Sequence, residues 1–177
     1  EYAKAFIKVS KNYKELLEEI KCFIFDVDGV LTNGKLLISD QGTLLRSMNV
    51  KDGFALKLAL KKGYKIGIIS GGNNPGVFKR LEGLGVADIF LNVSDKMQCY
   101  QSFKKKHNLT DQEIAFMGDD LPDYEVMQQA GLAVAPQDAV PEIKNIAHYV
   151  SHLKGGNACV RDLIRQVLKV QNQWFKT

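Results

Sequence analysis

The sequence has little cysteine and no long apolar run. Its three cysteines, Cys22, Cys99 and Cys159, are an odd number without paired spacing, which argues against a disulfide framework and against a zinc cluster. Thiols that stay reduced fit a cytosolic compartment. No apolar stretch is long enough to cross a membrane, and the N-terminus lacks the apolar core of a signal peptide. We therefore expect a cytoplasmic protein without a membrane partner.

A large excess of one charge is also missing. The chain has 24 Lys and Arg residues against 20 Asp and Glu residues, a formal net charge of +4 over 177 residues. The lysines are scattered apart from 61–62 and 104–106, and short runs of this kind are typical of solvated helix faces. No basic stripe alternates with aromatic residues, so we do not expect a nucleic-acid partner. The length suits a single domain, which we assign to residues 1–177.

What the chain does have is a series of short apolar runs separated by helical patterns. Runs at 22–25, 65–69 and 114–117 are almost wholly apolar, as in strands that are buried on both faces of a sheet. Weaker strand signals lie at 86–91, 132–135 and 149–150. Strands that alternate with helices predict a Rossmann-like α/β fold, in which a parallel sheet carries helices on both faces.

The helices are predicted from apolar spacing and from capping residues. A helical pattern occupies residues 1–20. Asp52 is expected to cap a helix that runs to about residue 62, and Ser94 to cap one that runs to about residue 108. Further helices are expected at 75–83, 122–130, 141–147 and 158–173, the last of them within a C-terminal tail and helix over about 154–177.

One segment interrupts the alternation of strands and helices. Residues 35–48 hold two apolar stretches around Asp40-Gln41-Gly42, which predicts a β-hairpin with a glycine-containing turn. Its side chains Leu36, Ile38, Leu44 and Met48 are too apolar to project into water alone. We therefore expect the hairpin to be covered, either by its own chain or by another copy.

Polar residues follow the apolar runs at the places where the strands should end. Asp26 and Asp28 come after the first run, Ser70 and Gly71 after the second, Asp119, Asp120 and Asp123 after the third, and Lys96 begins the helix after the weaker strand. Ligands bind beyond the carboxyl ends of parallel strands. These residues are therefore expected to share one site.

Several aspartates at one edge of a sheet raise one another's pKa unless a cation lies between them. Mg²⁺ suits such a site because it binds one or two carboxylates together with phosphate and water. A carboxylate can attack phosphorus as a covalent nucleophile, and a second acid can protonate the leaving oxygen. A lysine with hydroxyl and backbone donors can balance the charge of the transferred phosphoryl group. The residue set predicts Mg²⁺-dependent phosphoryl transfer.

The segment 26–32, Asp-Val-Asp-Gly-Val-Leu-Thr, resembles the first motif of the haloacid dehalogenase-like (HAD) phosphohydrolases. Ser70, Lys96 and the segment 118–123 are similar to the second, third and fourth motifs, in the order of the family. The resemblance extends from Lys21 onward. It implies that Asp26 is the nucleophile, which passes through an aspartyl phosphate, and that Asp28 is the general acid and base.

The same resemblance implies the remaining roles at the site. Asp26, Asp119 and the backbone carbonyl of Asp28 would bind Mg²⁺. Ser70, Gly71 and Lys96 would hold the phosphoryl oxygens. Asp120 and Asp123 would support the waters of the metal and the surrounding loop.

No large cap domain fits between Asp26 and Ser70 or between Ser70 and Lys96, so the chain resembles the capless branch of the family. Within that branch the hairpin and the segments 49–53 and 155–161 are most similar to the 3-deoxy-D-manno-octulosonate 8-phosphate (KDO8P) phosphatases of lipopolysaccharide biosynthesis. In those relatives four subunits join through their hairpins, and a neighbour partly covers each active site. The resemblance implies a homotetramer, a phosphorylated sugar acid as substrate, and contacts from Lys51 and Arg161 to its carboxylate.

Two places in the sequence depart from that pattern. Gly72 stands where relatives often carry arginine, and Asn157-Ala158 stands where a third glycine is common.

Three alternatives stay open. The first is a different substrate, a nine-carbon, sialic-acid-like 9-phosphate, although the segment 51–53 favours the eight-carbon acid. A phospho-acceptor signalling module would gather similar groups around Mg²⁺, but it lacks an acid two residues after the acceptor. A catalytically weak scaffold domain, kept for its hairpin interface, is the third alternative.

Overall fold

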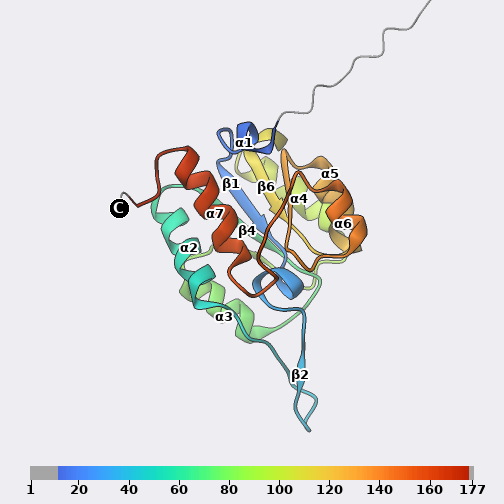
Figure 1. Ribbon diagram of the computed structural model, residues 1–177. Helices are drawn as coiled ribbons and strands as arrows, with labels where there is room; N and C mark the ends of the chain where they lie inside the picture. The colour runs from blue at the N-terminus through green and yellow to red at the C-terminus, as the bar shows by residue number, and fades with distance from the viewer. Residues whose placement is uncertain (1–11, 176–177) are drawn as a thin grey trace, which may run out of the picture.

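The computed structural model describes residues 12–175, and a parallel sheet forms its centre (Figure 1). Six strands lie in the order β5-β4-β1-β6-β7-β8, and every neighbouring pair is parallel. The strands are β1 (Cys22–Phe25), β4 (Lys65–Ile69), β5 (Asp88–Phe90), β6 (Ile114–Met117), β7 (Leu132–Ala135) and β8 (Tyr149–Val150). The Rossmann-like α/β fold predicted from the apolar runs is confirmed.

Helices cover both faces of this sheet (Figure 1). One face carries α2 (Val50–Lys61), α3 (Pro75–Gly83) and α7 (Cys159–Val170), and the other carries α4 (Lys96–Lys106), α5 (Tyr124–Gln129) and α6 (Pro141–Ile146). Successive side chains of a strand point to opposite faces. Phe23 and Phe25 therefore pack in the core beneath α2 and α7, whereas Cys22 and Ile24 pack in the core beneath α4 and α5. This division explains why β1 is apolar throughout.

Two helix caps differ from the sequence prediction. The side chain of Asn49 caps α2, which begins at Val50, so the prediction that Asp52 caps this helix is wrong. The side chain of Asp95 caps α4, and the prediction for Ser94 is also wrong. In both places a second residue of a capping type stands nearby in the sequence, and the local pattern could not rank the two.

The helical pattern of residues 1–20 yields only a short helix, α1 (Tyr13–Leu16), and residues 1–11 lie outside the described part of the chain. After α1 the backbone turns toward β1. The side-chain amide of Gln171 holds this turn, because its nitrogen donates to the backbone oxygens of Leu17 and Ile20, both at 2.8 Å. Contacts made by the far end of the chain therefore limit the helix.

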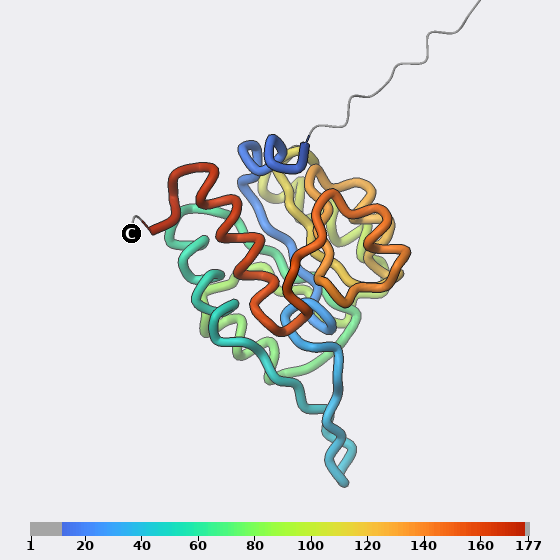
Figure 2. Tube along the Cα trace, viewed as in Figure 1, coloured from blue at the N-terminus to red at the C-terminus, as the bar shows by residue number. Residues whose placement is uncertain are grey.

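The predicted hairpin is formed by β2 (Leu37–Ile38) and β3 (Leu44–Leu45), which pair antiparallel. It projects from the body of the molecule beyond the carboxyl end of β1 (Figure 2). Leu37 is 69% exposed and Ile38 66% exposed, so a strongly apolar surface faces solvent in the single chain. Within residues 12–175, no helix is both long enough and apolar enough to pass through a membrane.

Candidate active site

The carboxyl ends of β1, β4 and β6 meet at one edge of the sheet because β1 pairs with both other strands. Asp26 directly follows β1, Ser70 follows β4, and Asp119 lies two residues after β6. The strand order therefore brings together residues that are far apart in the sequence, as the rule for parallel sheets predicts. A cavity of about 310 Å³ opens at this edge.

Eight of the ten predicted site residues line this cavity. They are Asp26, Asp28, Ser70, Gly71, Lys96, Asp119, Asp120 and Asp123. Ser70 is 2% exposed, and its hydroxyl oxygen accepts a hydrogen bond from the backbone N–H of Gly72 at 3.3 Å.

Three of the aspartates form a compact acidic cluster. Carboxylate oxygens of Asp26, Asp119 and Asp123 all lie within 4.8 Å of one another. Burial, followed by the charge of Asp123, raises the pKa of Asp26 to about 6. Burial, followed by the charges of Asp26 and Asp123, raises the pKa of Asp119 to about 8. Three carboxylates in this arrangement are unfavourable without a cation.

The donor set fits a hard divalent cation. One oxygen of Asp119, Oδ1, is buried and has no hydrogen-bond partner among the described residues, and an unpartnered buried oxygen of this kind is what a metal ion would satisfy. Asp123 has other partners, since it accepts from the Lys96 ammonium at 2.7 Å and from the backbone N–H of Asp119 at 3.1 Å. Its contacts match a supporting residue better than a principal ligand.

Lys96 joins the nucleophile position to this cluster. Its Nζ lies 3.0 Å from Oδ1 of Asp26 and 2.7 Å from Oδ1 of Asp123, and its side chain is 8% exposed. Burial acts against the charged form, but the carboxylates of Asp26 and Asp123 outweigh it and raise the pKa of Lys96. The lysine is therefore a fixed positive charge at the place where a phosphoryl group would bind.

A tight turn after β1 holds Asp28 above the sheet. Gly29 has φ +93°, and a Cβ at this position would lie 1.9 Å from Oδ2 of Asp119. Only glycine fits both the backbone conformation and the space. The turn therefore needs glycine between Asp28 and the acidic cluster.

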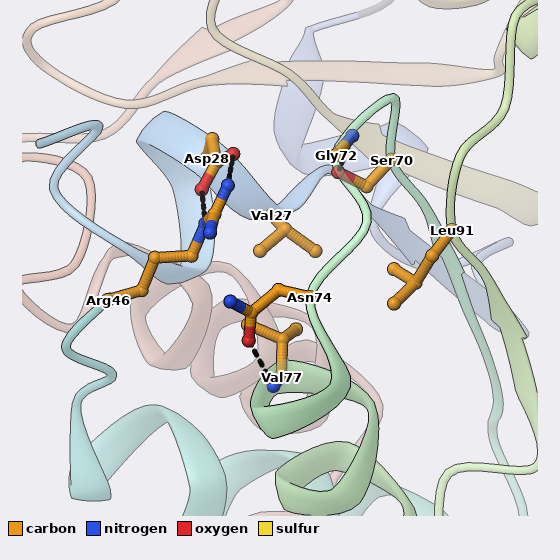
Figure 3. Close-up of a pocket in the computed structure, with 8 residues that line it drawn as sticks. All are labelled: Val27, Asp28, Arg46, Ser70, Gly72, Asn74, Val77 and Leu91. Carbon is orange, nitrogen blue, oxygen red and sulfur yellow. Dashed lines mark hydrogen bonds and ion pairs between the residues drawn. The ribbon is translucent and has the colours of Figure 1, made fainter. Parts of the chain in front are cut away.

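The Asp28 carboxylate has a partner that the sequence did not suggest. Arg46, which follows β3 of the hairpin, donates from Nε to Oδ1 at 2.7 Å and from Nη2 to Oδ2 at 2.9 Å (Figure 3). The one available signal is that Arg46 is a single cation in a strongly apolar stretch. Burial of such a residue calls for a partner.

The glycine pair 155–156 packs against the backbone of the same turn. A Cβ at Gly155 would lie 1.9 Å from the backbone oxygen of Gly29, and Gly156 donates its N–H to the oxygen of Val30 at 2.9 Å. The side chain of Asn49 also donates to the oxygen of Gly156 at 3.2 Å. The tail thus packs against the backbone of the turn that holds Asp28, where no side chain would fit.

The structure does not bring Lys51 and Arg161 to the cavity within the part of the chain that it describes. Lys51 is exposed in the first turn of α2. The guanidinium of Arg161 lies 5.6 Å from the ring centre of Phe54 and 5.5 Å from that of Trp174, a cation–π arrangement on the outer surface. Their contacts to a substrate stay predictions that a single chain does not test.

Comparison with known proteins gives a family match and relatives that align over most of the chain. The model of a haloacid dehalogenase-like hydrolase family matches residues 81–158, which include Lys96 and Asp119. KdsC of Salmonella typhi, a 3-deoxy-D-manno-octulosonate 8-phosphate phosphatase, is 33% identical over 93% of this chain and 88% of its own length.

Solved structures agree with this result. The phosphatase of the same name from Yersinia pestis superposes with a TM-score of 0.90 at 32% identity, over 92% of this chain and 88% of its own. The one from Moraxella catarrhalis, solved with a magnesium ion, a phosphate ion and a KDO molecule, superposes with a TM-score of 0.87 at 29% identity, over 90% of this chain and 92% of its own.

Proposed function

This chain belongs to the haloacid dehalogenase-like hydrolases and is a phosphatase of that family; from this premise we propose that it hydrolyses 3-deoxy-D-manno-octulosonate 8-phosphate with Asp26 as the nucleophile. The observation that carries the proposal is the meeting of Asp26, Asp119 and Lys96 at the end of β1. The substrate is inferred from the relatives, whose names specify this ester. Neither a phospho-acceptor signalling module nor an inactive scaffold has such support.

Asp26, Asp119 and the backbone carbonyl of Asp28 would hold Mg²⁺. Asp120 and Asp123 would support these ligands. The carboxylates of Asp26 and Asp119 both belong to the acidic cluster. When bound, the cation would neutralise charge on the phosphoryl oxygens and on the clustered carboxylates. Lys96 would bind the same oxygens from its buried position, and Ser70 and the backbone of Gly71, which line the cavity, would bind them as well.

Asp26 would attack phosphorus while the bond from phosphorus to the sugar oxygen breaks. Asp28 would give its proton to the leaving sugar oxygen. In the second half-reaction a water would attack the aspartyl phosphate, and Asp28 would take a proton from that water as the bond from phosphorus to Asp26 breaks. A pKa of about 6 leaves Asp26 mostly ionised at neutral pH, as a carboxylate nucleophile requires.

A phosphate-release assay across sugar acid phosphates tests the substrate. We expect kcat/KM for the eight-carbon 8-phosphate to exceed that for a nine-carbon, sialic-acid-like 9-phosphate by at least about 10-fold, since one added carbon in a shaped site commonly costs that much. Equal values, or a preference for the nine-carbon acid, would contradict the proposed substrate and leave the phosphatase chemistry in place. We place the reaction in the cytoplasm, which the three free thiols support.

We further propose that the chain is a homotetramer whose hairpins form the interface. Leu36, Leu37, Ile38, Leu44 and Leu45 are each between 38% and 69% exposed, and an apolar patch of this kind is typical of a contact surface. A neighbouring subunit would also shield an uncapped site from water and could bring a second chain's Lys51 or Arg161 toward the substrate.

Ile38→Asp is expected to convert the oligomer into monomers, because a charge buried between two hairpins is strongly unfavourable. Sizing chromatography with light scattering measures the outcome. Lys62→Asp, at the opposite end of the sheet, is the matched control and should keep the parent mass. An Ile38→Asp protein of unchanged mass would refute the hairpin interface.

A further inference from the structure

Arg46 is the most unusual residue on the hairpin. Its neighbours in the sequence, Leu44 and Leu45, are exposed, yet the Arg46 side chain is only 7% exposed. It points away from solvent and lies beside the turn that holds Asp28, where it makes a two-point ion pair with the Asp28 carboxylate (Figure 3). The hairpin thus sends its one inward-pointing cation to the proposed acid and base of the reaction.

This placement is costly. The third guanidinium nitrogen, Nη1, is buried without a hydrogen-bond partner among the described residues, and an unsatisfied buried donor costs free energy. Hydrogen bonding to Asp28 raises the pKa of Arg46, so the charge is retained. An apolar side chain could anchor the hairpin at this place without either cost. This unfavourable free energy indicates that the guanidinium does more than anchor the hairpin.

The geometry leaves Asp28 free to react while it is held. Each carboxylate oxygen has two lone pairs. Arg46 uses one on each oxygen, and the hydroxyl of Thr32 donates to Oδ1 at 3.5 Å. The Asp28 side chain is still 35% exposed and lines the 310 Å³ cavity. A planar guanidinium that binds both oxygens fixes the plane of the carboxylate. The second lone pair of Oδ2 is therefore left for the leaving oxygen.

One hydrogen bond and one glycine favour this arrangement. The side chain of Asn74 donates to the backbone oxygen of Leu44 at 2.8 Å, which holds the returning strand of the hairpin next to Arg46. At Gly72 a Cβ would lie 3.2 Å from Oδ2 of Asp28 and 3.4 Å from Nη2 of Arg46. A side chain at position 72 would therefore crowd the pair.

We propose that Arg46 is a positioning residue for catalysis. Its guanidinium orients the carboxylate of Asp28 toward the leaving oxygen and links the hairpin to the turn that holds Asp28. The inference rests on the proposed role of Asp28 in the phosphatase reaction. It does not depend on which phosphate ester is the natural substrate, because every ester must pass its leaving oxygen to the same acid.

Arg46→Ala tests the role through the chemistry of the leaving group. The single-turnover rate of leaving-group release is measured with a simple alkyl phosphate and with p-nitrophenyl phosphate. We expect at least about a 10-fold loss for the alkyl ester and a clearly smaller loss for p-nitrophenyl phosphate, whose leaving group needs little protonation. KM should stay within about 3-fold, since ground-state binding is not affected.

Rescue separates positioning from a merely structural contact. Added guanidinium ion, at concentrations that do not denature the protein, should restore part of the lost rate to Arg46→Ala and none to Asp28→Asn. Arg46→Lys should lie between the parent and Arg46→Ala, because a single ammonium cannot bridge both oxygens in one plane. Arg80→Ala, on the exposed side of α3, is the matched control and should keep parent rates with both esters.

Three results would overturn the inference. They are parent rates in Arg46→Ala, an equal loss with both esters that guanidinium does not rescue, and a higher KM for sugar acid phosphates as the sole change. Circular dichroism and sizing show whether each variant folds, and Arg46→Lys keeps the test open if Arg46→Ala does not. A parent protein that cleaves no phosphate ester would instead contradict the phosphatase proposal itself.

Discussion

Asp26→Asn is expected to lower kcat by at least about 10⁴-fold, the scale of loss when a covalent nucleophile is removed. Asparagine keeps the size of the side chain and an oxygen that can accept from the Lys96 ammonium, which lies 3.0 Å from Oδ1 in the parent. The fold and part of the cation site should therefore persist. Steady-state phosphate release measures the rate, and a thermal melt shows that the variant is folded.

Trapping the intermediate distinguishes the nucleophile from a residue that only binds. After acid quench, mass spectrometry should find one added phosphoryl group on the parent and none on Asp26→Asn. Asp28→Asn should slow both half-reactions, yet it should still carry the phosphoryl group when the substrate has a good leaving group. Glu142→Gln removes an exposed carboxylate from α6 and should behave as the parent. Turnover at parent rates in Asp26→Asn would remove Asp26 from its proposed role.

Placement of the acidic residues could be predicted because it depends on one rule of chain geometry. The apolar runs identified β1, β4 and β6, and parallel strands end at a common edge. Asp26 and Ser70 follow β1 and β4 directly, and Asp119 lies two residues after β6, so their meeting in one cavity needed no knowledge of side-chain packing. Lys96 was predictable for the same reason, since α4 begins at the edge where β5 ends.

Residues whose partners lie on other elements could not be placed in this way. Arg46 reaches Asp28 only because the hairpin folds back across the turn, a path of 18 residues. Asp52 has the sequence signature of a local helix cap, yet its Oδ1 accepts from the backbone N–H of Arg161 at 2.7 Å. It therefore supports the start of α7, which is 109 residues away. Local patterns contain no information about such distant contacts.

Removal of the divalent cation is expected to lower activity by at least about 10³-fold, because the loss of several kcal/mol of charge stabilisation corresponds to a factor of this size. It should also make the stability of the protein depend on pH. Without metal, burial and neighbouring acids raise the pKa of Asp26 to about 6 and that of Asp119 to about 8, and burial raises the pKa of Asp52 to about 6.

The sign of the pH effect follows from proton binding. Aspartates of an unfolded chain titrate near about pH 4, so between about pH 4 and 8 the metal-free native state holds protons that the unfolded state has lost. The free energy of unfolding then falls as pH rises across this window. Asp88, Asp111 and Glu113 have a lowered pKa and affect stability only below about pH 5. Tm in chelator should therefore decrease from about pH 5 to about pH 8.

Mg²⁺ should reverse this trend because a carboxylate must lose its proton before it binds a metal. The rise in Tm caused by Mg²⁺ is expected to be small at about pH 5 and large at about pH 8. Asp119→Asn should abolish most of this rise and should melt above the parent in chelator at high pH, since a neutral amide replaces a buried charge. Glu142→Gln should match the parent throughout. An equal Mg²⁺ shift at both pH values, or activity that chelator leaves intact, would place the cation away from the cluster of Asp26 and Asp119.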